Sequence, residues 1–241
     1  MVGRRDTPVQ LRRAGVVTLD ALGTLVALQP PAPLLAAGLR ARGIEVTERQ
    51  AAAAIVAEIA YYRAHHDMGA DAASLARLRA SCTEVLREGL VRAGADVGAL
   101  PAAELQDVLL ASLRFVPYEE VPAALRALRG AGHRLVVVSN WDVSLHEMLR
   151  VTGLRPLVDG AISSAEAGVA KPGAAIFERA LALAGGCPVG ALHAGDSLEH
   201  DVAGARAAGL RPVLVARTGR PPAVPGVSVI RSLTELAELA A

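Results

Sequence analysis

Gly15-Val16-Val17-Thr18-Leu19-Asp20 is the stretch of sequence that decides the fold. It is short, apolar and β-branched, and it ends on a carboxylate, which is typical of a buried parallel strand that carries a functional residue at its carboxyl end. Similar runs lie at Arg134 to Val138 before Ser139, at Ala191 to Gly195 before Asp196, and at Pro212 to Ala216. Because helical patterns separate these runs, the sequence predicts a doubly wound parallel sheet with helices on both faces.

Two helix signals support this interpretation in the C-terminal half. Phe177, Ala180, Leu181 and Ala184 follow the spacing of one apolar helix face. Ser232 to Glu235 has the spacing of a capping box at a helix N-terminus.

A long segment after the first strand has a different character. From about residue 30 to residue 116 the strand pattern disappears, and helical patterns rich in Ala, Leu, Arg and Glu replace it. Prolines stand at both borders, as expected where a chain leaves and re-enters a core. We therefore expect an N-terminal tail (1–13), a core (14–29 and 117–241) and an all-helical insert (30–116).

The composition indicates a folded globular protein and excludes several classes of function. Hydrophobic residues make up 52% of the 241 residues and charged residues 20%, so a packed core can form. The net charge is +1 and there are only six aromatic residues (one Trp, three Tyr, two Phe), which argues against a nucleic-acid partner. The uncharged run from Ala21 to Leu39 contains three prolines, so we expect no membrane span.

The two cysteines indicate a reducing compartment. Cys82 and Cys187 are far apart and fit no metal-binding or redox spacing, so we interpret both as reduced, small apolar residues. The basic N-terminus is not followed by the apolar run and cleavage pattern of a secretory signal. These features favour a cytoplasmic protein.

Three polar residues follow predicted strands and are expected to meet. Open α/β sheets bind ligands at the carboxyl ends of their strands, where Asp20, Ser139 and Asp196 would lie together. Two carboxylates at one edge repel each other unless a hard cation lies between them, and Mg²⁺ prefers oxygen ligands. The sequence therefore predicts a magnesium site at this edge.

Four separated motifs resemble those of the haloacid dehalogenase (HAD) superfamily, in the same order. They are Leu19-Asp20-Ala21-Leu22-Gly23-Thr24-Leu25, Ser139-Asn140, Lys171-Pro172, and Ala194-Gly195-Asp196-Ser197 followed by Asp201. The resemblance covers the core and implies a Rossmann-like fold. The helical insert is similar to the cap of one subgroup only in placement, length and helicity.

The resemblance also implies roles for these residues in a phosphatase reaction on a small phosphorylated metabolite. Asp20 is the expected nucleophile, and an aspartyl-phosphate is the expected intermediate. The remaining roles are charge neutralisation by Lys171, phosphate or substrate binding by Ser139, Asn140 and Thr24, Mg²⁺ binding by Asp20, Asp196 and the Leu22 carbonyl, and a supporting role for Asp201.

One residue departs from the pattern of the family's phosphatases. Two positions after the nucleophile they carry a second Asp, which protonates the leaving alcohol, whereas this chain has Leu22. Leucine transfers no proton, and general acid–base catalysis typically contributes about 10²–10⁴-fold. We therefore expect slow turnover of alkyl phosphate esters.

Two alternative functions remain open at this point. A 2-haloacid dehalogenase also lacks the second Asp, but those relatives carry an aromatic residue at the position of Leu22 and Asn at that of Asp196. A relative without catalytic activity that only binds a ligand is the other alternative, and Leu22 is its only support.

Two further segments are candidates near the site. His65-His66-Asp67 in the insert offers a replacement acid, but we expect an exposed polar face there, since adjacent helical residues point in different directions. Trp141 is expected either to line the substrate entrance or to pack under the insert.

Overall fold

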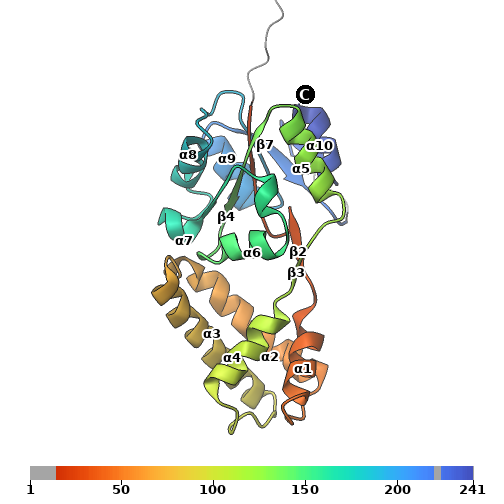
Figure 1. Cartoon of the computed structure of the whole chain (residues 1–241), viewed down its shortest axis with the longest axis vertical. Coiled ribbons are helices and arrows are strands. Elements are labelled where there is room, and N and C mark those ends of the chain that lie inside the picture. Colours follow the sequence, from red (N-terminus) through yellow and green to blue (C-terminus); the bar gives the residue numbers. More distant parts are fainter. Residues whose placement is uncertain (1–14, 220–223, 241) are drawn as a thin grey trace, which may run out of the picture.

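The core of the protein is a parallel sheet with the strand order β5-β4-β1-β6-β7-β8 (Figure 1). The computed structural model describes residues 15–219 and 224–240, so the predicted tail (1–13) lies outside the described residues. The strands are β1 (Val16–Leu19), β4 (Arg134–Ser139), β5 (Gly160–Ser163), β6 (Leu192–Gly195), β7 (Arg211–Val215) and β8 (Ser228–Ile230). The predicted doubly wound, Rossmann-like fold is confirmed.

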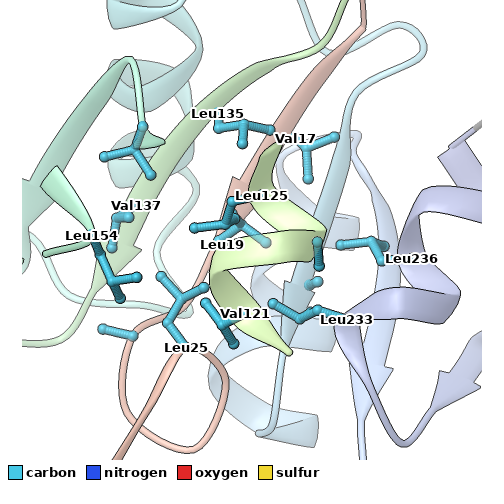
Figure 2. Close-up of a cluster of buried hydrophobic side chains, with 14 of the residues drawn as sticks. Val17, Leu19, Leu25, Val121, Leu125, Leu135, Val137, Leu154, Leu233 and Leu236 are labelled. Carbon is cyan, nitrogen blue, oxygen red and sulfur yellow. The ribbon is translucent and has the colours of Figure 1, made fainter. Parts of the chain in front are cut away.

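Alternate residues of each strand point to opposite sides of the sheet, and helices bury both faces. Val17 and Leu19 pack in one hydrophobic cluster, whereas Val16, Val136 and Val138 pack in another. The first face is covered by α5 (Val121–Gly130), α6 (Leu145–Val151) and α10 (Leu233–Ala240), and the second by α7 (Ser164–Ala167), α8 (Ala174–Leu183) and α9 (Gly204–Ala207). Figure 2 shows Leu125 of α5 and Leu233 of α10 against the first face.

Most local predictions for the core agree with the structure. The four predicted strands are present to within one residue at each end, and the apolar stripe Phe177–Ala184 is buried along α8. The capping box is formed only in part: the Glu235 carboxylate accepts from the backbone N–H of Ser232, but the Ser232 hydroxyl accepts from Thr234. The sequence pattern missed β5 and β8, since their runs are short and contain Gly or Ser.

Four helices form a separate unit, called here the helical insert (α1–α4), which packs around its own hydrophobic cluster. They are α1 (Pro31–Arg40), α2 (Glu48–His65), α3 (Ala72–Arg92) and α4 (Ala102–Ser112), with a 3₁₀ turn η1 (His66–Met68) after α2. A Cβ at Gly89 of α3 would lie 2.9 Å from the Cα of Ala54 in α2, so a glycine is needed for this close helix contact.

The insert joins the core through a two-stranded antiparallel ribbon of β2 (Val26–Leu28) and β3 (Phe115–Pro117). The sequence analysis predicted no strand here and assigned Phe115 and Val116 to the helical segment. Strands of three residues are too short to show alternation, which explains the error. The ribbon places the insert beyond the carboxyl ends of the core strands (Figure 1).

Within residues 15–219 and 224–240, no helix combines the length and apolar character that crossing a membrane requires.

The core clusters predict a clear contrast between two leucines on core helices. Leu125→Ala removes a fully buried side chain, so the free energy of unfolding should fall by about 2–5 kcal/mol in denaturant titrations followed by circular dichroism. Leu183→Ala, at a position 54% exposed, is the matched control and should change it by about 0.5 kcal/mol or less. Equal losses in the two variants would contradict the assigned core.

Candidate active site

The site is built where the chain order of the sheet reverses. β1 lies between β4 and β6, and Asp20 follows β1, Ser139 ends β4 and Asp196 follows β6. Open α/β sheets place ligands at such a reversal, outside the carboxyl ends of the strands. The predicted meeting of these three residues at one edge agrees with the structure.

The centre of the site is a buried ion-pair network. The Lys171 ammonium donates to Oδ1 of Asp20 at 2.6 Å and to Oδ1 of Asp201 at 2.5 Å. The Ser139 hydroxyl donates to the same Asp20 oxygen at 3.0 Å. All four residues are at most 6% exposed, so the ammonium and the carboxylates compensate one another away from water.

The pKa values in this network follow from burial and charge. Burial would lower the pKa of Lys171, but the two carboxylates outweigh it and raise the pKa above its ordinary value. Burial would raise the pKa of Asp201, yet Lys171 and His193 hold it well below its ordinary range. For Asp20, burial outweighs the ammonium and raises the pKa. Lys171 and Asp201 are therefore a firmly charged pair.

Asp201 is itself held by neighbours on η3 (Leu198–Ala203) and β6. The backbone N–H of Ser197 donates to its Oδ2 at 2.9 Å, and Nε2 of His193 lies 3.0 Å from its Oδ1. The other ring nitrogen of His193 lies 2.9 Å from the Thr18 hydroxyl. A Cβ at Gly195 would lie 2.1 Å from the Asp201 carboxyl carbon, so only glycine allows this approach.

Asp20, Asp196 and Asp201 form an acidic cluster. One oxygen from each carboxylate lies within 4.8 Å of an oxygen from each of the others. Loss of hydration and repulsion by Asp201 raise the pKa of Asp196. Three carboxylates against the single Lys171 ammonium leave an excess of negative charge, and oxygen donors of this kind suit a hard divalent cation. The residues present therefore fit Mg²⁺.

A glycine in the loop after β1 makes this cluster possible. Gly23 has φ +84°, and a Cβ there would lie 2.1 Å from Oδ2 of Asp196. Any other residue would strain the backbone and collide with the carboxylate.

Thr24 and Asn140 were both predicted to bind phosphate or substrate, and the structure shows different surroundings for each of them. Thr24 is fully buried and does not line the cavity, so its position differs from the prediction of a phosphate contact. The Asn140 amide accepts from the backbone N–H of Lys171 at 2.7 Å and donates to its carbonyl at 3.0 Å. Its bonding capacity is thus directed to holding the Lys171 loop.

Arg217, just after β7, is a residue of the site that the sequence analysis missed. Its guanidinium donates to the carbonyls of Gly23 and Thr24, pairs with Glu120 at 2.7 Å and lies over the Tyr118 ring. It therefore fixes the loop that carries Asp20. A charged residue after a core strand, at the same edge as the other candidates, was the available signal.

The expectation for the segment after α2 was wrong for His66. Its side chain is only 12% exposed and lines the cavity, because the 3₁₀ turn η1 directs it towards the core. Asp67 accepts a hydrogen bond from Ser164 of α7, so this turn contacts the core. Trp141 lines the cavity and packs on Phe115 of β3 with ring centroids 4.9 Å apart.

A cavity of about 770 Å³ lies between this site and the helical insert. Asp20, Leu22 and Lys171 line it from the core, and Glu58 and Leu109 line it from the insert. The volume is within the range of small-molecule sites. The site is therefore enclosed by both units.

The fold and this site define a doubly wound α/β protein with a ligand cavity at its strand ends. A family profile described as haloacid dehalogenase-like hydrolase matches residues 15–209, and the chain belongs to that family.

Known proteins similar to this chain carry different names. The chain is 44% identical over 98 residues to a bovine (Bos taurus) haloacid dehalogenase-like hydrolase domain-containing protein 3, covering 41% of this chain and 39% of that protein. It is 37% identical over 140 residues to a phosphoserine phosphatase of Thermus thermophilus, covering 57% and 55%. The matches thus span about half or less of these relatives.

Among solved structures, a 2-haloacid dehalogenase of Pseudomonas syringae matches with a TM-score of 0.65 and 24% identity, covering 94% of this chain and 97% of that one. This likeness shows the fold alone. The fold is therefore shared by proteins with different reactions, and only the site can discriminate between them.

The shared ammonium predicts a pH-dependent loss of stability in Lys171→Met. Two buried carboxylates lose their partner, so the free energy of unfolding should fall by about 3–5 kcal/mol at pH 7. In the parent protein the pKa of Asp201 is below its ordinary 3.8, so the contribution of the pair is present above that pH and is lost as the pH falls. The difference between the two proteins should therefore shrink when the pH is lowered below 3.8, for example to about pH 3, in chemical denaturation.

Arg129→Met provides the control, because its ion pair with Asp159 lies at the surface and should be worth about 1 kcal/mol or less. A loss for Lys171→Met that is as small as the control's, or that does not depend on pH, would contradict the ion-pair network.

Proposed function

We propose that this protein is a Mg²⁺-dependent phosphatase of a small phosphorylated metabolite, with Asp20 as the nucleophile. The observation that carries the proposal is the acidic cluster beside the Lys171 network. With Mg²⁺ held by Asp20, Asp196 and the Leu22 carbonyl, the site would be able to receive a phosphate dianion. The name of the Thermus relative, a phosphoserine phosphatase, supports the same class of reaction.

The chain's own residues have distinct roles in this proposal. Ser139 and Lys171 both bind Oδ1 of Asp20, which fixes the carboxylate and leaves Oδ2 for attack on phosphorus. Lys171 and Ser139 would then stabilise the charge on the phosphoryl oxygens while the bond from phosphorus to the leaving oxygen breaks and the aspartyl-phosphate forms. Water would then hydrolyse this intermediate and regenerate the Asp20 carboxylate. Bound Mg²⁺ supplies further charge stabilisation and orients the phosphate.

The helical insert is proposed to act as a cap. It lines the cavity over the strand ends, so the leaving group of the substrate would lie against α2 and α4. Exclusion of water from the site would strengthen the electrostatic interactions with the phosphate. Of the proposed domain boundaries, 29/30 lies just after β2, whereas 116/117 falls inside β3.

The dehalogenase alternative is supported by the fold but not by the charges of the site. A 2-haloacid carries a carboxylate, and an excess of negative charge from Asp20, Asp196 and Asp201 would repel it. Phosphate meets the same excess, but a divalent cation bound by these carboxylates would reverse it.

Hydrolysis of p-nitrophenyl phosphate with and without Mg²⁺ tests the proposal, because this aryl leaving group departs without a proton. We expect activity with Mg²⁺ that EDTA removes. Asp20→Asn should reduce kcat by at least about 10³-fold while circular dichroism and thermal unfolding show an intact fold, since an amide is a far poorer nucleophile.

Undiminished turnover by rigorously purified Asp20→Asn would refute the assigned nucleophile. Metal-independent release of halide from 2-chloropropionate would establish the dehalogenase instead. Mg²⁺ binding with no turnover across a panel of phosphorylated metabolites, acyl phosphates included, would favour the binding protein without catalysis.

Leu22→Asp should raise the turnover of alkyl phosphates more than that of aryl phosphates. Leu22 lines the cavity beside Asp20, and an alkoxide leaves poorly unless it is protonated. Burial and the neighbouring carboxylate would raise the pKa of the new acid and favour its protonated form. The measurement is the ratio of kcat/KM for butyl and p-nitrophenyl phosphate, with about a tenfold or larger increase expected.

Stability and Mg²⁺ affinity of Leu22→Asp are measured in parallel, with Leu22→Asn as the isosteric control that transfers no proton. If the folded, Mg²⁺-loaded Asp variant changes both substrates equally, the absent acid is not what limits alkyl esters.

A further inference from the structure

Glu58, on the wall of the cavity formed by α2, is a buried carboxyl that the catalytic site does not use. Its side chain is only 3% exposed, yet it lines the same cavity as Asp20. Its neighbour is the Cys82 thiol on α3, which is a weak hydrogen-bond donor. Within the described ranges, no Lys, Arg or His forms an ion pair with Glu58, although Arg63 and Arg79 line the cavity.

The other acidic side chains on this part of the wall are already bonded. Glu147 is held by the Arg150 guanidinium through two hydrogen bonds of 2.7 and 2.6 Å. Asp142 accepts from the Tyr62 hydroxyl at 3.0 Å and from the backbone N–H of Ser144 at 2.6 Å. Glu58 differs because the weak Cys82 thiol is its side-chain donor, which leaves acceptor capacity for the cavity.

Such a group is costly unless something binds it. Buried polar groups almost always have a partner, and burial raises the pKa of Glu58 to about 7, which the Cys82 hydrogen bond offsets only in part. Ile59, Leu78 and Leu109 give the same cavity an apolar portion. A ligand that fits this wall has an apolar middle and a hydrogen-bond donor at its far end.

We propose that Glu58 is a specificity-determining residue that accepts a hydrogen bond from a hydroxyl or ammonium group at the far end of the substrate's leaving group. The inference rests on the phosphatase function proposed above and narrows it to phosphates of amino alcohols or polyols. An anionic group at that end would meet an acidic side chain and be rejected.

Three alkyl phosphates of matched length test the proposal: 3-aminopropyl, 3-hydroxypropyl and butyl phosphate. All three have alkoxide leaving groups, so the absence of an acid at Leu22 affects them alike. The parent protein should prefer the first two in kcat/KM. Glu58→Gln should lose about ten- to hundredfold towards aminopropyl phosphate, the range for a hydrogen bond to a charged group, with butyl phosphate unchanged within about twofold.

Glu58→Met, which keeps the volume but removes both acceptors, should abolish the preference for the hydroxyl as well. Glu147→Gln is the matched control, since this glutamate lines the same cavity but is bound by Arg150, and it should not alter the order of substrates. Thermal unfolding of each variant shows that the fold is retained.

The proposal is overturned if the Glu58 variants affect all three compounds equally, or if they lower kcat for every alkyl phosphate but spare p-nitrophenyl phosphate. The second result would make Glu58 a proton donor instead of a binding residue. Calorimetric titration of aminopropyl and butyl phosphate into Asp20→Asn, with and without Glu58→Gln, tests selectivity by binding alone. Absence of turnover with every compound would thus refute the phosphatase. Equal affinities of Asp20→Asn for aminopropyl and butyl phosphate would instead refute the role of Glu58.

Discussion

The Lys171 ammonium, shared by Asp20 and Asp201, is the interaction on which the rest of the site depends. Three charges are buried together, and each would be strongly unfavourable without the others. The network requires that three segments of chain meet: the end of β1, the loop before α8 and the turn after β6. Asn140 at the end of β4 binds the backbone of Lys171 and thereby ties the loop to the sheet. The parallel sheet therefore brings these segments together and allows the ion pairs to form.

The carboxylates of the site outnumber its ammonium group, and this excess of negative charge links stability to chemistry. Lys171 satisfies Asp20 and Asp201, but Asp196 lies beside them without a cation of its own among the described residues. The ion pairs of Lys171 with Asp20 and Asp201 hold these side chains in place. In the proposed function, the remaining negative charge would bind a divalent cation and through it a phosphate group. Gly23 and Gly195 permit this crowding of carboxylates, since a side chain at either position would collide with one of them.

The sequence predicted the core of the site because its logic is local. A β-branched run that ends on a polar residue places that residue at a sheet edge. The sequence alone therefore predicts that Asp20, Ser139 and Asp196 lie together. Lys171 and Asp201 needed the family resemblance, because neither lies on a strand. What could not be predicted depends on packing: the burial of Thr24, the turn that directs His66 to the core, and the contact of Arg217 with a loop almost 200 residues away in the chain. Packing against α3 sets the rotation of α2 about its axis and directs Glu58 into the cavity. The sequence alone does not predict this rotation.

The two units of the chain have separate hydrophobic clusters, and this separation has a consequence for specificity. The Lys171 network belongs to the core, whereas Glu58 and the apolar wall around it belong to the helical insert. A change on the insert can therefore alter which leaving group fits without disturbing the ion pairs that order Asp20. Leu22 lies between the two, on the core loop but facing the shared cavity. In the proposed reaction, an apolar side chain at that position would leave the leaving group in contact with the insert and without an acid from the loop that carries Asp20, so the substrate would have to compensate for the absent proton. In the proposed reaction, binding of the metabolite's far end by Glu58 would assist a slow step only where this remote binding energy is used to orient the reacting centre.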